Sequence, residues 1–256
     1  SNLDDDMGGE SGSILVWDRV NATTSFADVA PTKVTDPDGS AGDQLGAGGV
    51  SLSADGLVLA AASFVDDIAG WRDSGSVSVW QRAQMNISFA NVTPSKLTDP
   101  DGASYDYLGR GGPALSADGL VVAAASYDDD EMGLNSGSVI VWARANMSVS
   151  FAHVSPVKLV DPHGDANDFL GYGGVCLSAH GLVLSASSQN DDDMGENSGA
   201  VLLWERASNS SSFSDVIPIK LTDSSGSADD LLGYGAPSLS ADGQVLAAAA
   251  HQDGDM

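Results

Sequence analysis

The chain has 256 residues and carries 36 acidic against 10 basic side chains, which gives a formal charge of −26 at neutral pH. This balance argues against a nucleic-acid binder, because a phosphate backbone requires a basic face, and against docking on anionic lipid. Hydrophobic residues make up 42% of the chain, which is enough for a folded core. Cys176 is the only cysteine, so an intrachain disulfide and a cysteine-based zinc cluster are excluded.

Apolar runs in the sequence are short. The stretch 56–62 is far below the ~20 residues that a helix needs to cross a bilayer, and no basic segment of the kind that opens a signal peptide is present. We therefore expect no membrane insertion. We also expect the sequence to be a mature product or a part of something longer.

Four similar segments make up the chain. A Ser-Gly-(Ser/Ala) triplet, an apolar run and a tryptophan recur at intervals of 62–63 residues. Each copy then holds, in the same order, an arginine, a phenylalanine, a proline, a lysine, a Leu-Gly pair and a Ser-Ala-(Asp/His)-Gly turn. The tryptophans and lysines of this pattern are Trp17, Trp80, Trp142 and Trp204, and Lys33, Lys96, Lys158 and Lys220. Such a period indicates a repeat architecture.

In chain order, each repeat reads as strands. Residues 13–17 form a short apolar run that predicts a buried strand. Residues 50–52 and 57–60 flank an Asp-Gly turn and predict a hairpin. Residues 89–97 predict a fourth, weaker strand, in which Pro94 suits an outer edge. Four strands in about 62 residues, repeated, predict an all-β fold of β-propeller blades, each a four-stranded antiparallel sheet.

The repeat boundaries set the predicted domain organisation. Residues 1–10 are expected to be the tail of a preceding repeat, and the last repeat is expected to be incomplete. The predicted blades are 11–73, 74–135, 136–197 and 198–256. Residues 1–8 also align with 188–195, and the segment 250–256 aligns with the same stretch. We therefore expect a segment of a larger propeller or tandem array, or a subunit that completes its blades with a neighbour.

The repeat resembles the FG-GAP family, the blades of integrin-α-like propellers. In the second copy the matching motifs are Tyr107-Leu108-Gly109, the turn 114–119, the strand 121–125, and Ser136-Gly137-Ser138 leading to Trp142. Two features depart from the family pattern: leucine replaces phenylalanine in the Phe-Gly pair, and the family's calcium loop is shortened to Ser-Ala-Asp-Gly. Integrin-type calcium binding is therefore not carried over to that turn.

Glycosylation sequons recur in the loops. Asn-x-(Ser/Thr) occurs at Asn21, Asn86, Asn91, Asn146 and Asn209. Four of the five fall in the same loop of successive repeats, between the Trp-x-Arg motif and the phenylalanine. This recurrence predicts covalent N-glycans on one exposed edge of every blade, and with them an extracellular or cell-surface protein.

Aspartate clusters follow the alanine-rich strands. Adjacent carboxylates repel each other unless they are solvated or bridged by a hard cation such as Ca²⁺. Two interpretations remain open: a calcium site, or a solvated acidic rim that keeps the protein soluble. The candidate metal ligands are Asp4, Asp5, Asp6, Asp128, Asp129, Asp130, Asp191, Asp192 and Asp193. A second acidic set, which includes Asp99 and Asp106, is interpreted as turn chemistry.

Catalysis finds little support. The four histidines each replace another residue in the other copies, and the sequence holds neither a nucleophile motif nor a phosphate loop. The leading hypothesis is therefore a non-enzymatic extracellular glycoprotein that acts as a structural building block of a filament or fibril by self-association or through neighbouring repeats. The alternative is a cell-surface adhesion or ligand-binding propeller module that depends on calcium. Trp71 lies outside the repeat pattern and is the best single candidate for an exposed contact.

Overall fold

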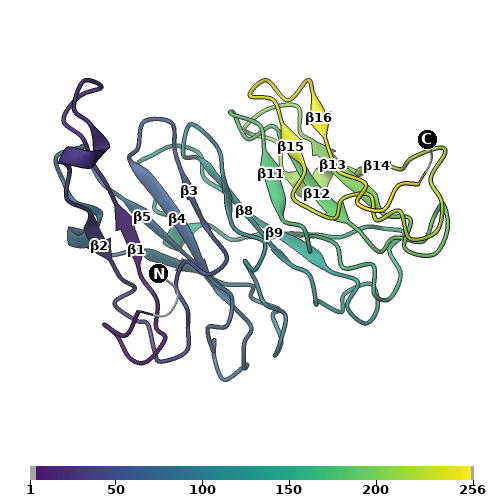
Figure 1. Cartoon of the computed structure of the whole chain (residues 1–256), viewed down its shortest axis with the longest axis horizontal. Coiled ribbons are helices and arrows are strands. Elements are labelled where there is room, and N and C mark those ends of the chain that lie inside the picture. The colour runs from purple at the N-terminus through teal and green to yellow at the C-terminus, as the bar shows by residue number, and fades with distance from the viewer. Residues whose placement is uncertain (1–3, 255–256) are drawn as a thin grey trace.

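The computed structural model describes residues 4–254, and in this range the chain is all-β. Three four-stranded antiparallel sheets and two two-stranded sheets follow one another along the chain (Figure 1). The predicted fold of four-stranded antiparallel sheets is thus confirmed, and the sheets are open rather than closed into a barrel. The complete sheets are β3–β6 (Val50–Leu52, Val58–Ser63, Ser76–Gln81, Ser95–Leu97), β7–β10 (Ala114–Leu115, Val121–Ser126, Ser138–Ala143, Val157–Leu159) and β11–β14 (Val175–Leu177, Val183–Ser188, Ala200–Glu205, Ile219–Leu221).

The two-stranded sheets lie at opposite ends of the array. β1 (Ile14–Val16) pairs with β2 (Thr32–Val34), and β15 (Ser238–Leu239) pairs with β16 (Leu246–Ala247). By sequence, β1 and β2 correspond to the third and fourth strands of a complete sheet, whereas β15 and β16 correspond to the first and second.

The sheets are offset from the segments predicted from the sequence. Each of the segments 11–73, 74–135 and 136–197 supplies the third- and fourth-strand positions of one sheet and then the first and second strands of the next. The Ser-Gly motif that opens each segment leads into the third strand of a sheet. The segments therefore have the period of the repeat, but their boundaries lie between the second and third strands of a sheet. Residues 1–3 and 255–256, at the edges of the outermost segments, lie outside the described residues.

The strand predicted over residues 89–97 is wrong in its first half. Residues Phe89–Asn91 form a 3₁₀ helix, and only Ser95–Leu97 form the strand β6. The hydroxyl of Ser88 accepts a hydrogen bond from the backbone N–H of Ala90 and caps this helical turn. Equivalent turns occur at Phe26–Asp28, Phe151–His153 and Phe213–Asp215. β6 does form an edge of its sheet, as the proline before it predicted.

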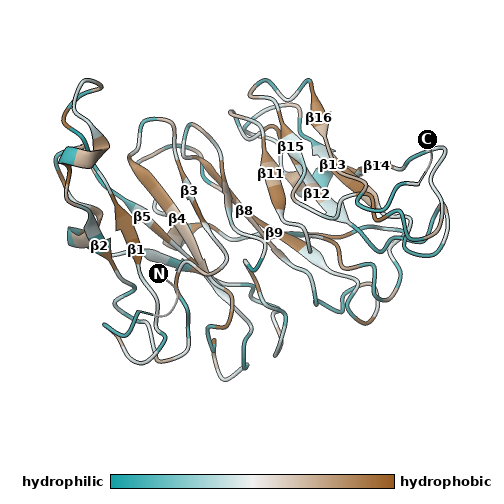
Figure 2. Ribbon diagram, viewed as in Figure 1, coloured by the Kyte–Doolittle hydropathy of each residue, from teal (hydrophilic) through white to brown (hydrophobic). Residues whose placement is uncertain are grey.

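Apolar side chains fill the spaces between neighbouring sheets. Trp80, Trp142 and Trp204 are each 1% exposed. Trp142, on β9, packs with residues of the preceding sheet such as Val77 and Val79. Figure 2 shows the apolar colour concentrated on the strands and the polar colour on the loops. The small alanines of β4 and β8 are fully buried, and they let adjacent sheets approach closely.

Backbone hydrogen bonds link each repeat to the next. The hairpin turns form a series in which Ala54 donates to the carbonyl of Ala117, Ala117 to that of Ala179, and Ala179 to that of Ala241. Within a repeat, Leu170, which precedes β11, donates to the carbonyl of Ser136, which precedes β9, so this bond links two successive sheets. Gly137 has φ +81°, and a Cβ there would come within 2.4 Å of the backbone nitrogen of Leu170, so the contact requires glycine.

Candidate functional site

The repeated lysines lie in the outermost strands, where one sheet meets the next. Lys96 is on β6, Lys158 on β10 and Lys220 on β14. Their side chains are only 16–20% exposed, whereas that of Lys33 on β2 is 41% exposed. A buried ammonium group requires a partner of opposite charge, and each of these lysines has at least two.

Lys158 shows the arrangement most clearly. Its Nζ lies 2.5 Å from a carboxylate oxygen of Asp129, which follows β8 in the same sheet, and 2.8 Å from one of Asp99, which follows β6 in the preceding sheet. Both carboxylates are 4% exposed. Burial opposes the charge of Lys158, but the two carboxylates raise its pKa overall. The lysine therefore joins two neighbouring sheets by an ion pair on each side.

We call this contact, in which one lysine pairs with a carboxylate from each of two neighbouring sheets, a lysine–carboxylate seam. It recurs at two further junctions. Lys96 lies 2.8 Å from Asp66 of its own sheet and 3.1 Å from Asp36 of the preceding unit. Lys220 contacts Asp191 of its own sheet and lies 2.8 Å from Asp161 of the preceding one. Each of these lysines pairs with a carboxylate of the preceding sheet. This shared contact explains why lysine recurs at the same position of each repeat.

A third carboxylate lies beside each seam. Asp106 accepts a hydrogen bond of 2.6 Å from the backbone N–H of Ala103, and burial raises its pKa to about 6. Asp43 and Asp168 are placed alike, and burial raises the pKa of each to about 6. Within the described residues, oxygens of Asp99, Asp106 and Asp129 lie within 4.8 Å of one another and could hold a metal ion. The ammonium group of Lys158 already lies against two of them and supplies a positive charge there.

Asp106 gives a testable pH dependence. Because its folded-state pKa of about 6 is above the unfolded value of 3.8, the folded protein retains this proton more strongly, and its contribution to stability falls as pH rises through this window. We expect Asp106→Asn to be more stable than the wild type at pH 8, by roughly 1 kcal/mol. The difference should shrink towards pH 4. Urea unfolding at several pH values measures it.

The control is Asp101→Asn, which changes an exposed aspartate of the same loop. It should leave the stability within about 0.5 kcal/mol of the wild type at every pH. A fall in stability at pH 8 on changing Asp106 would show that its carboxylate is a net stabiliser, contrary to this prediction.

The nine aspartates predicted as metal ligands have separate roles. Asp4, Asp129 and Asp191 each bind the lysine of their own sheet. Their neighbours close the acidic loop instead: Asp130 accepts a hydrogen bond from the backbone N–H of Asn135. In the same way Asp5 accepts from Glu10 and Asp192 from Asn197.

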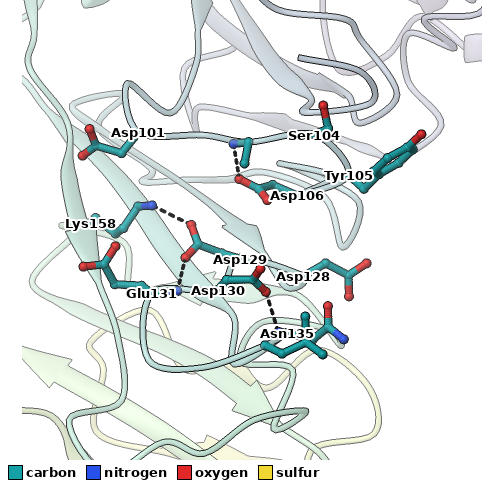
Figure 3. Close-up of a pocket in the computed structure, with 12 residues that line it drawn as sticks. Asp101, Ser104, Tyr105, Asp106, Asp128, Asp129, Asp130, Glu131, Asn135 and Lys158 are labelled. Atoms are coloured by element: carbon teal, nitrogen blue, oxygen red, sulfur yellow. Dashed lines mark hydrogen bonds and ion pairs between the residues drawn. The ribbon is translucent and has the colours of Figure 1, made fainter.

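Of the remaining three, two share a lysine with another member of the nine. Asp6 and Asp193 lie near Lys33 and Lys220. Asp128 points away from Asp129 (Figure 3), and burial raises its pKa. Within the described residues, the group of three carboxylates close enough to hold a metal ion consists of Asp99, Asp106 and Asp129, so calcium binding by the nine aspartates stays a prediction. The three-carboxylate group contains only Asp129 of the nine; the other two, Asp99 and Asp106, had been interpreted as turn residues, and the periodic lysine was the signal that could have linked them.

An open acidic hollow lies on this junction. It has a volume of about 560 Å³ and is lined by Asp128, Asp129, Asp130, Asp106 and Tyr105, among others (Figure 3). Lys158 also lines it, beside Asp129. The strong excess of carboxylates makes the hollow attractive to cations rather than to anionic ligands.

The sequon loops are held by the repeated arginines. Arg144 donates from Nε to the carbonyl of Gly119 (3.0 Å) and from Nη1 to that of Val149 (3.1 Å), and its guanidinium lies 4.3 Å from the ring centre of Phe151. These contacts fix the loop that carries Asn146. Arg82 and Arg206 stack on Phe89 and Phe213 in the same way. The asparagines of all five sequons are exposed: Asn21, Asn86, Asn91, Asn146 and Asn209.

Comparison with known families agrees with this architecture. Residues 93–142 match the FG-GAP repeat. The chain contains an FG-GAP repeat. The matched segment runs from just before β6 to the end region of β9 and includes Asp99, Asp106 and Asp129 of the seam. The match therefore covers β6 of one sheet and β7, β8 and most of β9 of the next.

Comparisons with whole proteins add little. No curated protein matches the sequence. Among solved structures, a functionally unknown protein from Desulfotomaculum acetoxidans is similar, with a TM-score of 0.46 and 11% sequence identity over 93% of this chain. The chain spans 56% of the length of that protein. Within the described residues, no helix is long and apolar enough to cross a membrane.

Proposed function

We propose that the chain is a non-enzymatic, extracellular, N-glycosylated FG-GAP repeat protein that serves as a structural building block of an extended assembly. The observation that carries this proposal is the identity of the junctions. The same lysine–carboxylate seam, the same turn-to-turn hydrogen bond and the same buried tryptophan recur from sheet to sheet. A catalytic site would place its polar residues in one blade only. In this chain the recurring polar residues hold neighbouring repeats together.

The distribution of polar groups supports a structural role. Each internal seam lysine is paired with a buried carboxylate on either side, so these charges join neighbouring sheets. The sequon loops lie on the surface, and those of Asn86, Asn146 and Asn209 are braced by the buried Arg82, Arg144 and Arg206. A glycan attached to these loops would extend into solvent without disturbing the core. The acidic loops add charge repulsion that opposes non-specific aggregation.

The proposal predicts glycans on the four repeat-equivalent sequons. Glycopeptide mass spectrometry of native material should find Asn21, Asn86, Asn146 and Asn209 occupied, because each is exposed in the same braced loop. Asn91 is an internal comparison, since it ends a 3₁₀ helix rather than lying in that loop. Unmodified asparagine at all four positions would contradict the extracellular, glycosylated part of the proposal.

Assembly is tested independently of the sugar. Sedimentation velocity of the chain should show species larger than one chain that grow with protein concentration. A single monomeric species at every concentration would contradict the building-block role.

A further inference from the structure

The tyrosines of the chain gather in one kind of loop. Every tyrosine lies in a loop that either precedes the first strand of a sheet or follows its second strand: Tyr105, Tyr107, Tyr127, Tyr172 and Tyr234. Ring contacts join four of the five into a series, from Tyr105 to Tyr107, from Tyr107 to Tyr127 and from Tyr127 to Tyr172. This series of phenols is separate from the repeated tryptophans, which pack between the sheets.

Tyr127 and Tyr172 form the closest pair of this series. Their ring centres are 5.1 Å apart and their planes meet at 82°, an edge-to-face arrangement that aromatic rings favour. The other two phenol pairs are 6.0 and 6.2 Å apart. Tyr127 follows β8 and Tyr172 precedes β11, so the closest pair spans the junction between two complete sheets.

The repeat shows that packing alone does not require this pair of phenols. The position of Tyr127 is taken by Phe64 in the preceding repeat and by Gln189 in the following one, and Arg110 stands at the position of Tyr172. Phe64 makes a similar ring contact with the next repeat, 6.3 Å from Tyr107. Among the junctions that residues 4–254 form, the one between β7–β10 and β11–β14 therefore has tyrosine at both positions. A phenylalanine would fill the same space, so the two hydroxyl groups call for a chemical explanation.

The surroundings hold one ring and leave the other open. Tyr127 is 4% exposed, whereas Tyr172 is 41% exposed. Arg110 donates a hydrogen bond to the hydroxyl oxygen of Tyr127, and its guanidinium lies 5.1 Å from the centre of that ring. A small oxidant in solution can therefore reach Tyr172, while Tyr127 is kept beside it. Two reacting groups held side by side combine far faster than groups that must meet by diffusion.

We infer that Tyr127 and Tyr172 are a site of oxidative cross-linking, at which their rings join as dityrosine across the junction. Each phenol gives up one electron and its hydroxyl proton and becomes a phenoxyl radical. The two radicals form a carbon–carbon bond between ring carbons next to the hydroxyl groups, and the hydrogen atoms on those carbons move to the oxygens. Hydrogen peroxide, acting through a peroxidase, accepts the two electrons and two protons and is reduced to two molecules of water.

The cross-link would join neighbouring sheets by a covalent bond, where the lysine–carboxylate seam joins them by charge. Like a disulfide, it restricts the unfolded chain and so raises the stability of the fold. The inference goes beyond the proposed function, because it requires neither glycans nor assembly. Its failure would leave that proposal standing.

Oxidation of the purified chain tests the inference. The folded protein is treated at low concentration with hydrogen peroxide and a haem peroxidase, and the monomer is then isolated by gel filtration. We expect dityrosine fluorescence and a mass lower by two hydrogen atoms. Mass spectrometry after proteolysis should find the peptide of Tyr127 linked to that of Tyr172. The melting temperature of the linked monomer should be higher than that of the untreated chain.

Two variants show whether this pair is responsible. Tyr172→Phe keeps the ring but removes the phenol, so the linked monomer should be lost. The matched control is Tyr105→Phe, which changes a tyrosine of similar exposure, 46%, outside the closest pair and should give the wild-type yield. Circular dichroism checks that both variants fold. Oxidation in urea should lower the yield of the linked peptide severalfold, because the rings are no longer held together.

Three results would each overturn the inference. One is a folded, oxidised wild type without the link between Tyr127 and Tyr172. Another is an undiminished yield of dityrosine in the monomer of Tyr172→Phe. The third is an equal yield of the linked peptide with and without urea, since the fold would then play no part in bringing the two rings together.

Discussion

Replacing Lys158 with methionine is expected to lower the free energy of unfolding by about 3–5 kcal/mol at neutral pH. Methionine keeps the length of the side chain but removes the charge that Asp99 and Asp129 share. Both carboxylates are 4% exposed, so they would stay buried without a counter-charge. Urea unfolding of the variant and the wild type measures the loss.

Lys33 provides the matched control. It binds Asp4 and Asp6, but its side chain is 41% exposed and it pairs only within its own sheet. Lys33→Met should cost much less stability than Lys158→Met, because exposed ion pairs are screened by solvent. Similar small losses for both variants would show that the internal seams do not hold the sheets together. Adding Asp129→Asn to Lys158→Met should restore part of the stability, because one unpaired charge is removed.

The variant Lys158→Met also distinguishes the two interpretations of the aspartate clusters, a calcium site and a solvated acidic rim. In the wild type the ammonium group of Lys158 lies against Asp99 and Asp129, so we expect millimolar calcium to leave the melting temperature unchanged. In Lys158→Met the three carboxylates of Asp99, Asp106 and Asp129 face one another without it, and calcium should raise the melting temperature. A calcium shift in the wild type would instead favour the calcium-dependent binding module.

Replacing Trp142 with alanine should have an effect of similar size. The indole is 1% exposed and packs between two complete sheets, so its loss leaves a large cavity at the junction and costs about 3–5 kcal/mol. In a linear array each unit depends on its neighbours, so the thermal transition should also broaden as the two sides uncouple. Differential scanning calorimetry measures both changes.

Trp71→Ala is the control for this variant. Trp71 is 52% exposed and lies in a loop outside the repeat pattern, so its removal should change stability by less than about 1 kcal/mol. Equal losses for the two tryptophans would contradict the assignment of the repeated tryptophan to the packing between sheets.

The sequence predicted the strands and the period because both depend on local patterns. The Asp-Gly turns, the apolar runs and the recurring tryptophans, of which Trp80, Trp142 and Trp204 are buried, specify hairpins and a core without any knowledge of distant contacts. The segment 89–97 was misread as one strand because the capping by Ser88 and the break before β6 are effects of single residues. The sequence did not show where each sheet begins and ends along the chain. The pairing of β4 with β5 joins strands on either side of a loop, and no local sequence pattern reveals it.

The candidate site was harder to predict because its parts come from two sheets. Asp99 and Asp129 are 30 residues apart in a sequence with many aspartates, and only the fold selects which carboxylates face Lys158. Adjacent aspartates suggested one shared cation, but the loop turns Asp129 inwards and Asp130 towards its own backbone. The lysine positions were visible in the repeat, and their partners needed the structure.

Electron microscopy of native material tests the structural account most directly. An extended assembly of this chain predicts particles that extend over many copies, as continuous fibres with a regular axial repeat. Separate particles of single-chain size in native material would contradict the proposal that this chain is the building block of an extended assembly.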